Sequence, residues 1–375
     1  MAGIYIHIPF CRQACHYCDF HFSTNLKTQS EMVNAIGQEI RSRRDYINET
    51  IETIYFGGGT PSLLTKTQFE HLLTSIKENF RLGDSPEITL EANPEDLTPE
   101  KASAMYKQGI NRLSVGVQTF NEEKLTWMNR VHSSTEAKTA YENARAVGFD
   151  NISLDLIYAI PDHDRSDWEK DLSTIVQLDP EHISLYGLTI EDKTVFGKWE
   201  KENRLIQVPE DEAAAQYLLA IDFLKRAGFV QYEVSNFGKE GFYSRHNNAY
   251  WSGVPYLGVG PGAHSFNGTT RSFNVRNNPK YIKAIKEGLS YSETEQLSDT
   301  QRLNEQILTQ LRTAKGLDLI AIEERAGESL LKLHSGFIDE LREKDLVATE
   351  GNYLRLKSRG FLVADEIALR LFFPE

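Results

Sequence analysis

The three cysteines of the chain are the residues best suited to chemistry. Cys11, Cys15 and Cys18 lie within eight consecutive residues of a 375-residue sequence that contains no other cysteine. An odd number of thiols at such tight spacing argues against a disulfide framework. Thiolates are ligands for zinc and for iron–sulfur clusters, so these three residues are candidate metal ligands.

The CxxxCxxC spacing favours an iron–sulfur cluster over zinc. A structural zinc site takes four ligands, and the sequence has no second cysteine pair to complete one, although a histidine such as His16 or His21 could do so. Three cysteines on one loop suit three irons of a 4Fe-4S cluster and leave the fourth iron open to an outside ligand. Three incidental buried thiols are the weakest of these interpretations.

Further candidate binding residues follow the predicted strands. A FGGGTP segment (56–61) comes after the second of them, and its glycines allow a ligand to approach the backbone closely. Glu91 and Gln118 end the third and fourth strands, and Asp155 lies within the fifth. Buried polar side chains need partners, which a bound ligand could supply. Each residue taken alone is better explained by a structural role, but together, on successive strands, they indicate a pocket.

The elements that must position these residues alternate between strands and helices. This alternation predicts right-handed βαβ crossovers and a parallel α/β sheet, either doubly wound or part of a (β/α) barrel, with function at the C-terminal ends of the strands. Strands are predicted at 3–8, 53–56, 87–91, 112–117, 151–158 and 182–186, and helices at 29–44, 66–80, 99–108, 135–147 and 166–177.

The second half of the chain has a different pattern. A helix over 210–225 leads to a possible seventh strand at 229–234. Residues 235–278 are rich in Gly, Asn, Ser and aromatic residues with little periodicity, and we expect an irregular segment there. A winged-helix-like module is predicted from helices at 299–313, 318–325 and 329–344 and a hairpin at 347–356.

Composition and charge exclude several classes of protein. The residues are 40% hydrophobic and 25% charged, which is ordinary for a globular protein and excludes a fibrous or wholly disordered chain. The net charge of −13 makes a nucleic-acid partner unexpected. No window approaches the ~18 to 20 apolar residues of a membrane span, and no signal-peptide pattern is present. We expect a cytoplasmic protein with at most transient membrane association.

The cysteine motif resembles that of the radical S-adenosylmethionine (radical SAM) superfamily. The motif follows a first βα strand and has an aromatic residue, Tyr17, before its last cysteine. The resemblance implies an α/β fold, a partial (β/α)6 radical SAM barrel, in which Cys11, Cys15 and Cys18 hold a 4Fe-4S cluster and the open iron binds S-adenosyl-L-methionine (SAM). The expected units are the core barrel over 1–235, an irregular connecting segment over 236–285, and a C-terminal helical, winged-helix-like domain over 286–375.

Along its whole length the sequence resembles the oxygen-independent coproporphyrinogen III oxidase-like family, which includes the dehydrogenase and the heme chaperones of the HemW branch. The matching segments are 5–11, 57–62, 91–94, 114–120 and 155–161. The resemblance implies that Tyr5, Gly58 and Glu91 contact the methionine end of SAM. The positions that surround a second SAM in the dehydrogenase are matched by Tyr17, Gly59, Thr60, Gln118, Arg130 and Asp155.

Two departures and one motif favour the chaperone branch. The dehydrogenase has a further cysteine where this chain has Phe20, and an extension ahead of the first strand, which is predicted here at about residue 3. The HNxxYW signature of the chaperones matches 246–251. The match implies that His246 contacts heme, with Tyr250 and Trp251 beside the porphyrin.

The expected function is therefore that of a heme chaperone. It would bind heme and transfer it to an acceptor, expected to be a respiratory hemoprotein, and would lack coproporphyrinogen III dehydrogenase activity. The alternatives are that dehydrogenase itself, which uses radical SAM oxidative decarboxylation in heme biosynthesis, and a zinc-binding structural protein.

Overall fold

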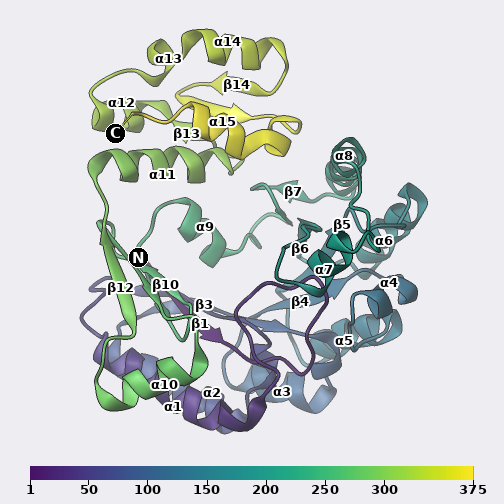
Figure 1. Cartoon of the computed structure of the whole chain (residues 1–375), viewed down its shortest axis with the longest axis vertical. Helices are drawn as coiled ribbons and strands as arrows, with labels where there is room; N and C mark the ends of the chain where they lie inside the picture. Colours follow the sequence, from purple (N-terminus) through teal and green to yellow (C-terminus); the bar gives the residue numbers. More distant parts are fainter. Residues whose placement is uncertain (375) are drawn as a thin grey trace.

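A curved parallel sheet forms the main part of the molecule, with helices along its outer face and a smaller domain above one side (Figure 1). The computed structural model describes residues 1–374. Six strands lie side by side in chain order, and the predicted alternation is confirmed. They are β1 (Ala2–Ile8), β2 (Ile51–Gly58), β3 (Leu82–Ala92), β4 (Arg112–Gln118), β5 (Ile152–Tyr158) and β6 (His182–Gly187).

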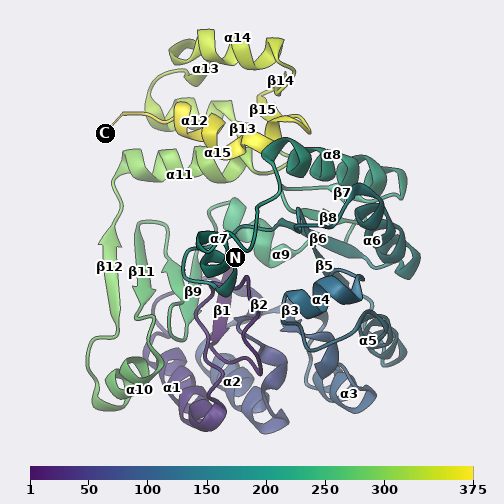
Figure 2. The ribbon, with the colours of Figure 1, turned by 45° about the vertical axis from the view of Figure 1, so that its right-hand side comes forward.

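The crossovers between these strands carry helices that lie along the outside of the curve (Figure 2). The sheet does not close on itself among the described residues, as expected for a partial barrel. The main crossover helices are α1 (Gln29–Ser42), α2 (Lys66–Asn79), α3 (Pro99–Lys107), α5 (Ser134–Ala146) and α6 (Arg165–Leu178), and α8 (Glu210–Arg226) follows β6.

Alternation along each strand separates the apolar core from the polar interior of the curve. In β1, Ile4, Ile6 and Ile8 are buried in the hydrophobic core, whereas Tyr5 and His7 lie on the opposite face. Tyr5 pairs in register with Tyr55 of β2, and His7 with Gly57. The interior of the curve is therefore lined by polar and aromatic side chains that a ligand could contact.

The prediction of an irregular segment over 235–278 is wrong. This part of the chain extends the sheet on both sides, because β8 pairs with β6 and β9 pairs in parallel with the other edge strand, β1. The predicted strand at 229–234 is reduced to β7 (Val230–Gln231). The new elements are β8 (Asn236–Gly238), α9 (Arg245–Trp251), β9 (Tyr256–Val259), β10 (His264–Phe266) and β11 (Thr270–Asn274).

The C-terminal domain begins after the last strand of the large sheet. That strand, β12 (Ser292–Gln296), pairs with β11 although it falls in the range expected for the C-terminal unit, and α10 (Asn278–Glu287) precedes it. The predicted helix at 329–344 is broken at His334. The domain contains α11 (Asp299–Leu311), β13 (Leu317–Asp318), α12 (Leu319–Ala326), α13 (Leu330–Leu333), α14 (Ser335–Glu343), β14 (Val347–Glu350), β15 (Tyr353–Leu356) and α15 (Ala364–Arg370).

The three short C-terminal strands form a separate sheet in the order β13-β15-β14, and the helices pack around it. This arrangement of helices and a terminal hairpin matches the expected winged-helix-like module. Within residues 1–374, no helix is long and apolar enough to cross a membrane.

Candidate functional site

The cysteine loop leaves the C-terminal end of β1 and returns to it. The Cys11 N–H donates to the Ser23 carbonyl (3.1 Å), and the Ser23 N–H donates to the Pro9 carbonyl (2.9 Å). These bonds close the base of the loop, and all three cysteine residues are partly buried. The structure therefore presents Cys11, Cys15 and Cys18 together at the strand ends where the sequence predicts the site.

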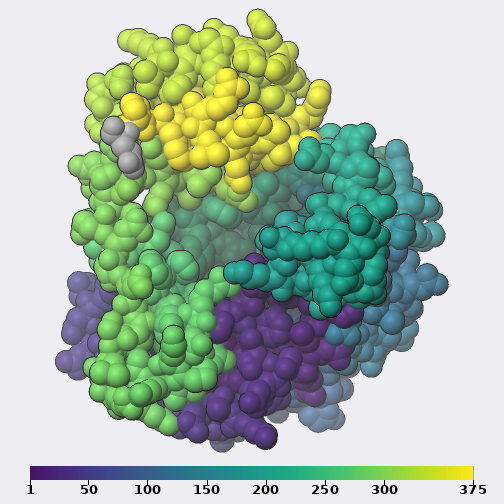
Figure 3. Space-filling view, in the orientation of Figure 1, coloured from purple at the N-terminus to yellow at the C-terminus, as the bar shows by residue number. Residues whose placement is uncertain are grey.

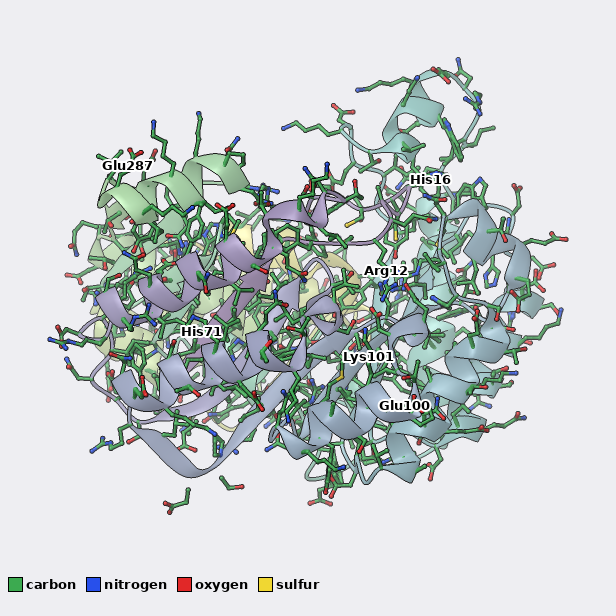
Figure 4. The ribbon with its side chains drawn as sticks, turned by 90° about the horizontal axis from the view of Figure 1, so that it is seen from below. Arg12, His16, His71, Glu100, Lys101 and Glu287 are labelled. Carbon is green, nitrogen blue, oxygen red and sulfur yellow. The ribbon has the colours of Figure 1, made fainter. Side chains whose placement is uncertain are left out.

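A buried carboxylate anchors the start of this loop to the sheet. Asp96 accepts hydrogen bonds from Arg12 (2.7 Å), which follows Cys11, and from Lys101 of α3 (2.9 Å). Figure 4 shows Arg12 and Lys101 beside one another between the loop and α3. Ser62 also donates to Asp96 (2.9 Å). The loop is thus fixed to two crossovers of the sheet.

Polar side chains from the β2–β3 and β4–β5 crossovers reach the sulfurs. The Thr60 hydroxyl donates to Cys11 Sγ and the Arg130 guanidinium donates to Cys15 Sγ, each at 3.4 Å. Asn93 connects the two, since its amide donates to Thr60 Oγ1 (3.3 Å) and accepts from Arg130 (2.9 Å). Thr60 and Arg130 were singled out from the sequence. Asn93 was not, although it lies two residues after Glu91 in the matched segment.

Burial makes two of the three thiols weaker acids than a free cysteine. It raises the pKa of Cys11 to about 12 and that of Cys18 to about 11. Metal ligation deprotonates cysteine, so the protons would leave on binding. Among the described residues, no three His, Cys, Asp or Glu side chains form a group that could hold a single metal ion. A 4Fe-4S cluster needs no such convergence because each thiolate binds a different iron.

The glycine segment packs directly against the cysteine loop. A Cβ at Gly59 would lie 2.6 Å from the Phe10 carbonyl oxygen, so no side chain fits there. The Thr60 N–H donates to that same oxygen (2.7 Å). Gly58 has φ of +109°, which glycine adopts without strain. This close approach of backbones explains why the predicted ligand-binding turn contains successive glycines.

Glu91 lies beside this turn in the interior of the curve. Its carboxylate accepts from the Gly58 N–H (3.1 Å) and from the Tyr55 hydroxyl (2.9 Å). Burial raises its pKa to about 7. The Tyr5 ring stacks on Tyr55 at 6.1 Å. Tyr5, Gly58 and Glu91, which were assigned together from the resemblance, are therefore neighbours in the structure.

Asp155 and Gln118 occupy the far side of the same interior. Asp155 accepts hydrogen bonds from Ser114 (3.0 Å) and Ser153 (3.0 Å), and burial raises its pKa. Gln118 has φ of +71° at the end of β4, which is unusual for a residue with a side chain. Strained backbone of this kind often occurs at ligand sites. Neither residue lies in the hydrogen-bond network of the thiols.

Aromatic side chains that sequence reasoning missed cover the outer side of the loop. The Phe196 N–H of α7 (Val195–Lys201) donates to the His16 carbonyl (3.0 Å), and the His16 ring contacts Trp199 edge-on at 5.0 Å. Tyr17 packs near Phe196 at 6.5 Å, and Figure 4 shows His16 on the loop next to α7. α7 has only seven residues, too few to show a helical period in the sequence.

His246 lies near the opposite end of the strands. Its ring is 2% exposed and stacks on Tyr55 at 5.0 Å, and its Nδ1 is hydrogen-bonded to the hydroxyl of Thr53, near the start of β2, at 2.8 Å. Burial lowers its pKa to about 3, so the imidazole is neutral. Its Nε2 is buried and has no hydrogen-bond partner within residues 1–374. His246 is thus separate from the cysteine loop and lies on a helix, α9, where irregular backbone was expected.

Comparisons with known proteins bear on the family and the fold of the chain. The model of the radical SAM superfamily matches residues 5–175, and that of the HemN C-terminal domain matches residues 297–363. A protein named heme chaperone HemW from Bacillus subtilis is 37% identical over 371 residues, with 98% of each chain covered. The Lactococcus lactis protein of that name is 35% identical over 363 residues, covering 97% of this chain and 95% of the relative.

The fold has a solved counterpart. The chain is similar to the structure of coproporphyrinogen III oxidase (HemN) from Escherichia coli, with a TM-score of 0.85 and 22% sequence identity. The match covers 99% of this chain and 90% of the other.

Proposed function

This chain belongs to the heme chaperone HemW family of radical SAM proteins, and we propose that it binds heme and transfers it to an acceptor hemoprotein. The family resemblance inferred from the sequence is confirmed. We further propose that the acceptor is a respiratory hemoprotein and that transfer takes place at the cytoplasmic side, with at most transient membrane association.

The observation that carries the proposal is the state of the His246 imidazole. Heme iron accepts a neutral imidazole nitrogen as an axial ligand. The low pKa keeps this ring neutral, the Thr53 bond occupies Nδ1, and Nε2 lacks a partner in the described part of the chain. Burying a nitrogen without a hydrogen-bond partner costs free energy. Such a group in a folded protein therefore calls for a functional explanation. We propose heme ligation as that role.

Tyr250 lies between the His246 ring, which it contacts, and a cavity that it lines. Its ring contacts His246 edge-on at 5.0 Å, and it lines a large neighbouring cavity that His246 itself does not line. Ligation of heme by His246 therefore requires the Tyr250 side chain to move. Such a gate suits a carrier, which must release its cargo as well as hold it.

The cysteine loop fits a resident 4Fe-4S cluster. Cys11, Cys15 and Cys18 would hold it, and the Thr60 and Arg130 donors would stabilise two of the ligating sulfurs. Glu91 and the Gly58 backbone would bind the amino and carboxylate end of SAM. An ammonium group beside Glu91 would offset the cost of its burial and favour the ionised carboxylate. When bound, the cluster supplies the electron that can cleave SAM.

Genetic complementation tests the proposal against the dehydrogenase alternative. Expression of this chain in a strain that lacks the oxygen-independent coproporphyrinogen III dehydrogenase is expected not to restore anaerobic growth without added heme. The reason is that Phe20, a 72% exposed residue on the cysteine loop, stands where the dehydrogenase pattern has a cysteine.

The control for this test is the dehydrogenase expressed from the same vector, together with an iron measurement that shows the chain carries its cluster. Robust growth with the chain alone would contradict the chaperone assignment and support the enzyme.

A further inference from the structure

A cavity of about 1100 Å³ lies between the open side of the curved sheet and the C-terminal domain. Figure 1 shows α9 between the sheet and α11, and Figure 3 shows the same face hollowed between the yellow-green C-terminal domain and the teal segments. Ligand pockets usually measure roughly 300 to 1,000 Å³ and occur preferentially at domain interfaces. The cavity is therefore large enough for a tetrapyrrole.

The sheet and α9 supply aromatic side chains to one side of this cavity. Tyr250 and Trp251 come from α9, Tyr256 from β9 and Phe266 from β10. The Tyr250 ring contacts Tyr256 edge-on at 4.4 Å, and Tyr256 lies 6.4 Å from Phe266, so three of these four rings are grouped together. An aromatic surface of this kind suits a flat apolar ring.

Arginines from β11 and the C-terminal domain line the other side. The cavity contains Arg271, Arg302, Arg312 and Arg325, although the chain as a whole has a net charge of −13. Three carboxylates, Glu233, Asp299 and Glu305, also line it, so its lining has more cations than anions. Three of the four arginines pair with carboxylates, so Arg325 supplies the unbalanced positive charge that an anionic group could use.

Two of these arginines can still donate hydrogen bonds to an anion. Arg325 is exposed and donates to the neutral amide oxygen of Gln306. Arg302 pairs with Asp299, whose side chain is 92% exposed, and donates to the Gly268 carbonyl (3.3 Å), but its buried Nε has no hydrogen-bond partner within residues 1–374. Gln306 lies one turn from Arg302 on α11, so the two guanidinium groups belong to the same wall.

The other two arginines form ion pairs that join separate elements, although the buried Nε of Arg312, like that of Arg302, has no hydrogen-bond partner among the described residues. Arg271 binds Glu305 at 2.8 Å and so ties β11 to α11. Arg312 pairs with Asp365 and lies over the Trp251 ring at 5.3 Å. Arg302 pairs with an exposed carboxylate of its own helix and Arg325 donates to a neutral amide, so these two are the candidates for ligand recognition.

We infer that this cavity holds heme, with the tetrapyrrole against Tyr250 and Trp251 and its propionates on Arg302 and Arg325. Heme combines a flat apolar ring with two carboxylates on one edge, which matches an aromatic side opposed by guanidinium groups. Arginine binds carboxylates through paired charge-assisted hydrogen bonds. The inference rests on the proposed function and adds a site for it. It also places the heme next to Tyr250, whose ring contacts His246.

The test compares heme with heme dimethyl ester, whose ring is the same but whose propionates carry no charge. Each ligand is titrated under anaerobic conditions into the cluster-loaded protein and followed in the Soret band. The unmodified protein is expected to bind the ester at least about tenfold more weakly than heme, the effect of losing a charge-assisted hydrogen bond. This arm needs no substitution and so does not depend on the folding of a variant.

The second arm uses the Arg302→Gln/Arg325→Gln double variant. It is expected to bind heme at least about tenfold more weakly than the unmodified protein and to bind the ester as the unmodified protein does. The matched control is Arg342→Gln, which removes a partly exposed arginine of α14 that is paired with Asp339 and does not line the cavity.

The inference would be overturned if the double variant kept the heme affinity of the unmodified protein. It would also be overturned if the variant lost affinity for heme and for the ester by the same factor. Either result would leave the proposed function intact, because heme would still bind to the unmodified protein. If the unmodified protein did not bind heme at all, the result would contradict both the proposed function and this inference.

Discussion

Replacing Cys11, Cys15 or Cys18 with serine is expected to reduce bound iron from about four atoms per chain to nearly none. Each thiolate holds a different iron, and among residues 1–374 no other cysteine is present to substitute for a lost one. A serine hydroxyl is a much weaker ligand for iron than a thiolate. Iron and acid-labile sulfide are measured after anaerobic reconstitution, together with the visible absorption of the cluster.

The matched control is Phe20→Ala, which changes an exposed residue of the same loop and is expected to keep the full iron content. Stoichiometric zinc with no uptake of iron in the unmodified, anaerobically prepared protein would show that the cluster assignment is wrong. Full iron content in all three serine variants would do the same.

The second large effect is expected at His246. His246→Ala should lower heme affinity at least about tenfold and remove the axial-ligand signature from the Soret spectrum. The iron–sulfur absorbance should stay, because His246 lies near the start of β2 and the cysteine loop lies beyond the ends of the strands. Heme titration and iron analysis on the same preparation measure both.

His264→Ala provides the control for this prediction. His264 is an exposed histidine of β10, in the segment that follows α9, and its loss is expected to leave heme binding unchanged. If a well-folded His246→Ala protein kept the same heme affinity and Soret spectrum, His246 would not be the axial ligand. His264 would then be the next candidate.

The cysteine loop and the glycine turn were predictable because their chemistry is local. Cys11 to Cys18 and Gly57 to Thr60 are contiguous motifs, and the rule that parallel strands end at one edge brings them together. The six central strands were predictable for a similar reason, since each has a run of apolar or β-branched residues bounded by a helical pattern. The structure confirms both.

The elements that the sequence did not reveal depend on distant partners. β9 has only four residues, and its partner β1 lies about 250 residues earlier, so no local period could show it. The same applies to His246, whose position is fixed by Thr53, Glu87 and Tyr55. Asn93 could not be identified from the sequence, because its role depends on contacts with Thr60 and Arg130. These two residues are distant in the sequence and come together only in the folded chain.

Heme transfer to an acceptor is the measurement that tests the central claim most directly. The cluster-loaded protein carrying one heme is mixed anaerobically with an apo-hemoprotein, and the Soret bands of donor and acceptor are followed after the two are separated. We predict that the acceptor gains heme as the chain loses it, and that His246→Ala protein delivers much less. Heme that stays on the chain in the presence of excess acceptor, or that reaches the acceptor no faster than free heme does, would contradict the account.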